Sequence, residues 1–358
     1  MPRDDAYNHT VPRRSDGTRQ TFRPKQPWPA DKPFRLLSID GGGILGLLPC
    51  LVLAEFEKRF LDGEPIGTHF DMIAGTSTGG IIAMGLGQGK SAQEISKLYL
   101  ERGHHIFPGN WFSRISRKIT QYFMSAHDRK NLENELRREF GDRLFGSSQN
   151  RLCIPSFEGR YGEPYIFKTP HHPDYKRDQH KTLVTVGMAT AAAPGTFAAH
   201  EDGGYTFVDG GLWANNPTMV GLTDAMACFD INPRQVRILS LGCGQDIHRM
   251  SRWQRVGGFW HWRKHFTSSV MRAQSHDAIG QAGLHVGRDN LIRLDAPEVG
   301  KRIAMDDVDR AVVQMPPVAR ALAEASGHRV ADTFFYAEDG QLAHRDFGPM
   351  ECRSRQDE

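Results

Sequence analysis

The chain contains 358 residues and carries a formal net charge of +3, from 45 lysines and arginines against 42 aspartates and glutamates. Its 39% hydrophobic and 24% charged residues are typical of a globular protein with one large core or two modest ones. So small a charge argues against DNA or RNA as a partner, and no apolar run approaches the ~18 residues of a membrane-spanning helix.

The cysteines and histidines form no familiar metal-binding motif. Five cysteines lie far apart without a C-x-x-C pair, and H-E-x-x-H is absent. An odd, scattered set of cysteines predicts reduced thiols in a cytosolic protein. The polar start of the chain does not resemble a secretory signal. We therefore expect a cytoplasmic protein without a metal site.

In chain order, residues 1–33 are rich in proline and charge, which predicts a flexible leader. A domain is expected over 34–340, with its core at 34–245, followed by a tail at 341–358. Strands are expected at 34–39, 70–74, 152–155, 165–167, 205–208, 236–241 and 291–294, and helices from Leu47 and at 80–88, 92–102, 128–140 and 217–228. Such alternation predicts an α/β fold, a three-layer α/β/α sandwich with a mostly parallel central sheet.

Ser77 lies at the centre of the pentapeptide Gly75-Thr76-Ser77-Thr78-Gly79, between an expected strand and an expected helix. A strand, a sharp turn with serine at its tip and a helix make up a nucleophile elbow. Gly75 and Gly79 suit this elbow because a Cβ at either place would collide with the crossing backbone. An ordinary Gly/Ser turn is an equal alternative from the pentapeptide alone.

Three successive glycines, Gly41, Gly42 and Gly43, follow the first expected strand. Unobstructed N–H groups at a helix N-terminus are suited to binding negative charge. The segment 41–46 matches G-x-G-x-x-G, so a dinucleotide site is one interpretation, with Asp62 near the distance of a ribose contact but in a turn. An oxyanion hole is the other, and the elbow one β-α unit later favours it.

Asp209 ends the expected strand 205–208 and is followed by two glycines. An Asp-Gly turn at a strand end is the common meaning of this pattern. The glycine-rich loop, the elbow and Asp209, in this order and at these separations, resemble the patatin-like phospholipase family. The resemblance is good over 34–245 and looser over 246–340.

This resemblance implies a serine lipid acyl hydrolase that cleaves membrane phospholipids without a cofactor. Ser77 would be the nucleophile and Asp209 its base, with the three glycines as the oxyanion hole. Burial would then have to raise the pKa of Asp209 toward neutrality, because an ordinary carboxylate is a poor base for an alcohol. Leu45 stands where the family usually has Arg or Lys, so charge stabilisation there would rest more on backbone dipoles.

Two other functions stay open. One is a Ser-Asp-His triad in an unregulated lipase, for which six histidines follow Asp209 in the chain. The candidates are His261, His265, His276, His285, His328 and His344. The other is a non-catalytic protein that binds lipid or a nucleotide through a decayed site.

Four of the six tryptophans fall in two basic, aromatic segments, 105–123 and 252–266, within the lid or cap regions expected at 104–130 and 246–290. Aromatic rings beside Lys and Arg suit a membrane interface. The same composition suits a pocket for a dianionic nucleotide, and the rings could equally be buried. The sequence leaves these alternatives open.

The segment 167–172 is similar to bacterial patatin-like effectors of CBASS anti-phage defence. That resemblance implies a cyclic dinucleotide activator of the cGAMP type and peripheral contact with the inner face of the membrane. Whether the chain forms a homo-oligomer is left open.

Overall fold

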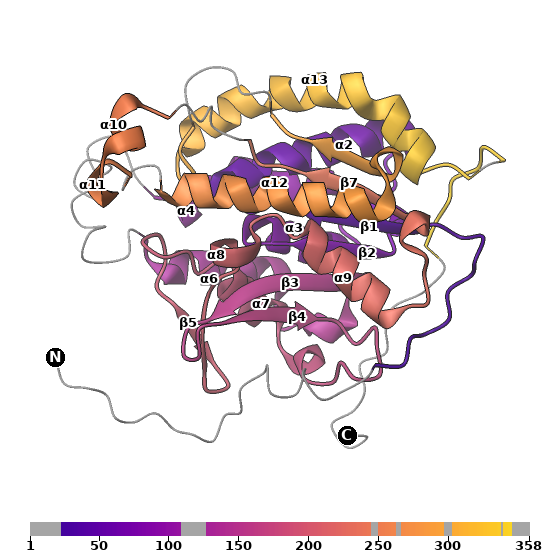
Figure 1. Ribbon diagram of the computed structural model, residues 1–358, viewed down its shortest axis with the longest axis horizontal. Helices are drawn as coiled ribbons and strands as arrows, with labels where there is room; N and C mark the ends of the chain where they lie inside the picture. Colours follow the sequence, from indigo (N-terminus) through magenta and orange to yellow (C-terminus); the bar gives the residue numbers. More distant parts are fainter. Residues whose placement is uncertain are drawn as a thin grey trace.

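The computed structural model describes residues 23–108, 127–244, 250–262, 266–296, 303–337 and 339–345. An eight-stranded sheet lies at its centre, with helices on both faces (Figure 1). The strands are β1 (Phe34–Ile39), β2 (Met72–Gly75), β3 (Arg151–Glu158), β4 (Glu163–Lys168), β5 (His200–Asp202), β6 (Tyr205–Asp209), β7 (Val236–Leu241) and β8 (Leu291–Leu294). All but β5 correspond to strands expected from the sequence.

The sheet is parallel at its centre and antiparallel at one end. Strands β3, β2, β1, β7 and β8 lie side by side in that order and run parallel. Strands β4 and β6 pair antiparallel with β3, and β5 pairs antiparallel with β6. The α/β sandwich is thus confirmed with a mixed sheet. Short turns join β3 to β4 and β5 to β6, and such turns reverse the chain.

Strands β2 and β6 share one edge of β3. Cys153 of β3 pairs with Ala74 of β2 on this edge and with Lys168 of β4 on the other. Further along the first edge, Ser156 pairs with Asp209 of β6. Because β2 is parallel to β3 and β6 is antiparallel to it, the carboxyl ends of β2 and β6 approach each other.

Helices cover both faces of the sheet (Figure 1). The larger hydrophobic core contains residues of α2 (Leu47–Phe60), α3 (Thr78–Gly87), α4 (Ala92–Ile106), α6 (Arg129–Phe140), α7 (Leu183–Thr190) and α13 (Val308–Phe334). The smaller core, on the opposite face, contains residues of α9 (Thr218–Cys228) and α12 (Phe266–Val286). Three short helices, α8 (Gly211–Ala214), α10 (Arg252–Val256) and α11 (Phe259–Trp262), complete the described elements.

Strand β1 shows how one apolar run supplies both cores. Phe34 and Leu36 belong to the smaller core, whereas Leu37 and Ile39 belong to the larger one, and all four are fully buried. Successive side chains of a strand point to opposite faces. A strand covered on both faces therefore needs a continuous apolar sequence.

Helices α12 and α13 were not predicted from the sequence. The four buried residues of α12 are small or medium-sized, Ser275, Ala278, Ala282 and Val286, so its helical periodicity is weak. Helix α13 contains Pro316-Pro317 in its interior, where sequence rules predict a break. No helix of the described residues is long and apolar enough to cross a membrane.

The described part of the expected leader contacts the domain. The N–H of Gln26 donates to the carbonyl oxygen of Cys228 at 2.8 Å. The ring of Trp28 lies 4.9 Å from that of Phe34 and 5.7 Å from that of Phe229, centroid to centroid. Residues 23–33 are therefore anchored, while 1–22 and the tail from 346 lie outside the described residues.

Candidate active site

Ser77 sits at the tip of a strained turn between β2 and α3. Its φ is 54°, in the left-handed region that residues other than glycine rarely adopt. A Cβ on Gly75 would lie 2.1 Å from the carbonyl oxygen of Gly79, and one on Gly79 would lie 2.2 Å from that of Ile39. Both elbow glycines are thus required by the close approach of the backbone, as expected from the sequence.

Neighbouring threonines hold this turn in place. The N–H of Ser77 donates to Thr190 Oγ1 at 3.0 Å, and the Thr190 hydroxyl donates to the carbonyl oxygen of Pro155 at 2.6 Å. The Thr76 hydroxyl donates to the carbonyl oxygen of Ala214 at 2.6 Å. These bonds tie the elbow to α7, β3 and α8, which offsets the cost of the strained backbone. The sequence did not single out either threonine.

Asp209 meets Ser77 because the carboxyl ends of β2 and β6 face each other. Its Oδ1 accepts a hydrogen bond from the N–H of Gly211 at 2.7 Å, and the Ser77 side chain lies near enough to the carboxyl group to lower its pKa. The residue is only 5% exposed. Burial raises the pKa of Asp209 to about 6, against the lowering effect of Gly211 and Ser77. The burial and the raised pKa are those that a carboxyl base at this position would need; its catalytic role stays a prediction.

The glycine-rich loop lies beside the elbow. A Cβ on Gly41 would lie 3.3 Å from that of Ser77, and Gly43 has a φ of 59°. The N–H of Gly41 donates to the carbonyl oxygen of Asn215 at 3.0 Å, so it is not available to an oxyanion. In the described chain the N–H groups of Gly42 and Gly43 donate to no acceptor of the fold. The three-glycine oxyanion hole expected from the sequence therefore reduces to these two donors.

A buried ion-pair network fixes the start of this loop. Arg293 of β8 donates to both carboxyl oxygens of Asp40, at 2.9 and 2.7 Å, and to Asp295 at 2.8 Å. Burial raises the pKa of Asp40 to about 6 although Arg293 lowers it, and the two carboxylates raise the pKa of Arg293. The pair is therefore charged at neutral pH. Paired charges of this kind position the backbone that follows Asp40.

A family model described as patatin-like phospholipase matches residues 37–222, a span that includes the glycine-rich loop, Ser77 and Asp209. The chain belongs to the patatin-like phospholipase family. It is accordingly a lipid-hydrolysing enzyme.

Similar proteins come from several organisms. A "cGAMP-activated phospholipase" of Escherichia coli (strain TW11681) is 33% identical over 312 residues, which cover 79% of this chain and 87% of that protein. A "cGAMP-activated phospholipase" of Vibrio cholerae serotype O1 is 32% identical over 296 residues, covering 73% of this chain and 81% of that protein. Among solved structures, VipD from Legionella pneumophila gives a TM-score of 0.41 at 12% identity, over 83% of this chain and 67% of that chain.

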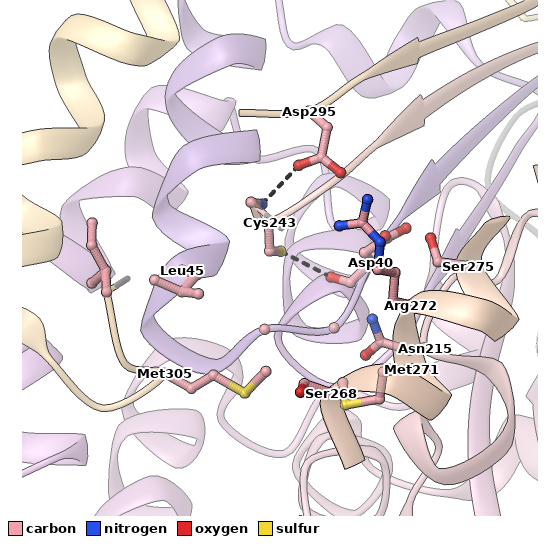
Figure 2. Close-up of a pocket in the computed structure, with 14 residues that line it drawn as sticks. Asp40, Leu45, Asn215, Cys243, Ser268, Met271, Arg272, Ser275, Asp295 and Met305 are labelled. Carbon is pink, nitrogen blue, oxygen red and sulfur yellow. Dashed lines mark hydrogen bonds between the residues drawn. The ribbon is translucent and has the colours of Figure 1, made fainter. Parts of the chain in front are cut away.

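A cavity of about 100 Å³ adjoins the glycine-rich loop of this patatin-like enzyme. Figure 2 shows Met271, Arg272 and Ser275 of α12 on one side of it and Leu45 on the other. Leu45 is 8% exposed and belongs to the larger hydrophobic core. Arg272 therefore brings a cationic side chain to the cavity that Leu45 lines.

The histidines considered for a triad lie elsewhere wherever the structure describes them. His261 stacks on Trp253, His328 packs on Phe60, His344 binds Glu64, and His276 and His285 are exposed on α12, whereas His265 lies outside the described residues. The Asp209 carboxyl group accepts from the N–H of Gly211, and Ser77, but no histidine, is among the described residues that shift its pKa. The described histidines of this set therefore do not bridge Asp209 and Ser77.

The segment 167–172 forms a buried polar cluster with Asp224 of α9. Lys168 Nζ lies 2.5 Å from Asp224 Oδ1, and His171 Nε2 lies 2.7 Å from Asp224 Oδ2. These partners lower the pKa of Asp224 despite its burial, and Cys153 Sγ lies 3.4 Å from the same carboxylate. Cys153, His171 and Asp224 are close enough to hold a metal ion, but Lys168 already neutralises the carboxylate. The cluster ties β4 to α9.

Proposed function

We propose that Ser77 and Asp209 form a catalytic dyad that hydrolyses fatty-acyl esters of membrane phospholipids. The observation that carries this proposal is the position of the strained Ser77 beside Asp209, a buried carboxyl group whose pKa is raised to about 6 by desolvation. General bases work best when their pKa lies near the working pH. An exposed aspartate, with a pKa of about 3.9, would be a much weaker base.

In the first step, Asp209 takes the proton of the Ser77 hydroxyl as Oγ attacks the ester carbonyl carbon. The carbonyl electron pair moves onto oxygen, and the N–H groups of Gly42 and Gly43 are the donors available to bind this oxyanion. The N-terminus of α3, which begins directly after Ser77, favours negative charge there. Collapse of the intermediate breaks the ester C–O bond, and the leaving alkoxide takes the proton from Asp209.

The second step releases the fatty acid. Water attacks the acyl-enzyme while Asp209 accepts a proton from it, and a second oxyanion forms at the same donors. Its collapse breaks the bond to Oγ, and Ser77 regains its proton from Asp209. Asp209 therefore acts in each half-reaction first as a base toward the attacking group and then as an acid toward the leaving group.

Labelling with a fluorophosphonate probe tests the nucleophile. The wild-type protein should carry one adduct on Ser77, and Ser77→Ala should carry none. Asp209→Asn should react at least about a hundredfold more slowly, since general base catalysis contributes about 10²–10⁴-fold. Ser268→Ala, a change in the adjoining cavity, should label normally. An adduct on another residue would overturn the dyad, and no adduct in the wild type would favour a non-catalytic binding protein.

We further propose that a cyclic dinucleotide activates the enzyme, as an effector of bacterial CBASS defence that acts at the inner face of the cytoplasmic membrane. Two proteins of 32–33% identity are named as cGAMP-activated phospholipases, which supports the proposal. Phospholipid vesicles should be hydrolysed when cGAMP is added and spared without it. Equal hydrolysis in both conditions would refute the activator and leave the dyad standing.

A further inference from the structure

Large exposed apolar side chains are concentrated in one stretch of the described chain. We call this set the aromatic face, and its members are Met250 (43% exposed), Trp253 (68%), Val256 (79%), Trp260 (71%), Phe266 (50%) and Val270 (44%). The other large apolar side chains that are exposed among the described residues are scattered along the chain: Leu212 on α8, Leu284 near the far end of α12, Met305 before α13 and Val313 on α13. Apolar side chains gathered on a surface in this way mark an interaction site.

The aromatic face is held rigidly. Trp262 turns inward, and its Nε1 donates to the carbonyl oxygen of Gln254 at 3.0 Å, which ties α11 to α10. The rings of Trp253 and His261 stack at 6.0 Å between centroids. A Cβ on Gly257 would lie 2.5 Å from the carbonyl oxygen of Trp253, so the link between the two helices is tight. Trp253 and Trp260 are therefore presented outward at little entropic cost to a partner.

This face lies at the same edge of the molecule as the candidate active site. Parallel strands have their carboxyl ends at one edge, and α10 and α11 follow the carboxyl end of β7. The glycine-rich loop follows β1, and Ser77 follows β2. Figure 1 shows α10 and α11 projecting at this end, beyond the helices that cover the sheet.

The charged side chains in the stretch that carries the face are all basic. Arg252 and Arg255 are exposed on α10 beside Trp253 and Val256. The sequence contains no aspartate or glutamate from residue 250 to 276. Trp and Phe beside Arg suit the boundary between anionic headgroups and acyl chains, where rings enter the apolar layer and cations stay outside.

We infer that the aromatic face docks on an anionic lipid bilayer. Helix α12, which carries Phe266 and Val270 of this face, contacts the segment after Asp209: Gln274 accepts from the N–H of Asn216 at 3.1 Å, and Ser275 Oγ accepts from Asn216 Nδ2 at 3.2 Å. Docking therefore orients the edge that carries Ser77 toward the bilayer. The inference rests on the proposed function in this respect, because the docked bilayer is also the substrate.

Vesicle co-sedimentation in the Ser77→Ala background tests docking without hydrolysis. Vesicles that contain phosphatidylglycerol should bind this protein, and the further changes Trp253→Ala and Trp260→Ala should lower the partition coefficient at least about tenfold. Binding should weaken on phosphatidylcholine alone and when salt rises from about 0.1 to 0.5 M. Leu284→Ala with Val313→Ala, two exposed positions outside the face, is the matched control and should bind normally.

Hydrolysis of a short-chain, water-soluble ester, measured with cGAMP added, by the double tryptophan variant with Ser77 intact separates the two proposals. Unchanged turnover shows that the variant folds and that only docking is lost. Absence of ester turnover in the wild type would count against the dyad and not against docking. Docking is overturned if the tryptophan changes leave vesicle binding unaltered. It is also overturned if they abolish cGAMP binding or self-association while vesicle binding is retained.

Discussion

Replacing Asp209 by asparagine should stabilise the protein at neutral pH while it removes activity. Asparagine keeps an oxygen that accepts the hydrogen bond from Gly211 but carries no charge. The wild-type protein keeps a carboxylate buried there at pH 8, and its raised pKa records the cost of that charge. The substitution removes both the cost and the base.

The size of the effect follows from the pKa. Burial moves the pKa of Asp209 from an ordinary value of 3.8 to about 6, a shift of about 2 units. Each unit corresponds to ~1.36 kcal/mol, so Asp209→Asn should raise the free energy of unfolding by about 3 kcal/mol at pH 8. The raised pKa of Asp209 does not lower the free energy of unfolding at a pH below the pKa of the unfolded state. It lowers that free energy by the full amount at a pH above the pKa of the folded state. The difference between the proteins should therefore grow between about pH 4 and pH 6 and then level off.

Thermal unfolding of both proteins from pH 4.5 to pH 8 measures this difference. At pH 8 the Asp209→Asn variant should melt about 5 °C higher than the wild type, and near pH 4.5 the gap should nearly close. Asp230→Asn, a change at an exposed carboxyl group, should produce no such pH-dependent gap. In parallel, kcat/KM of the wild type for a soluble ester should fall tenfold per pH unit below about pH 6.

Two results would refute this reasoning. If Asp209→Asn is no more stable than the wild type at pH 8, burial does not perturb the carboxyl group as the geometry requires. If the variant retains its activity, Asp209 is not the base, however buried it is.

Further changes test the elbow and the loop support. The free energy of unfolding of Ser77→Gly should exceed that of Ser77→Ala by about 1–3 kcal/mol, because only glycine relieves the strain of the positive φ. Thermal unfolding of the two variants measures this difference. Gly75→Ala should be severely destabilised or insoluble. Gly280→Ala, a change at an open helical position, should raise the free energy of unfolding by about 0.5–1 kcal/mol, as measured by chemical denaturation. Arg293→Met should cost about 3–5 kcal/mol by isolating the Asp40 carboxylate, and adding Asp40→Asn should recover part of that loss; full stability of Arg293→Met would contradict the pairing.

The residues of the candidate site that the sequence could predict are those whose role shows in a local pattern. Gly75 and Gly79 flank the serine at fixed offsets, and both prove to be in backbone contact. Asp209 follows an apolar strand and precedes two glycines. The rest depends on partners that are distant in the chain. Arg293 binds an aspartate 253 positions away, and no local pattern identifies such a pair.

The glycine-rich loop shows the same limit at the level of single atoms. Three consecutive glycines predict three free N–H groups, but Asn215 takes the one on Gly41. The fold also departs from expectation where spacing carries little information. Helix α12 buries small residues, and α13 continues through Pro316-Pro317 because its packing against the larger core outweighs the local cost.

The direction of β6 bears on how the proposed dyad would work without a histidine. In a wholly parallel sheet, the carboxyl end of each strand lies beside those of its neighbours. Here β2 and β6 run toward each other along one edge of β3, so the carboxyl group of Asp209 lies beside Ser77. Its pKa of about 6 is close to the ~6.5 of an ordinary histidine. Burial thus supplies the base strength that an imidazole would otherwise provide, and exposing Asp209 should cost activity even where its position beside Ser77 is retained.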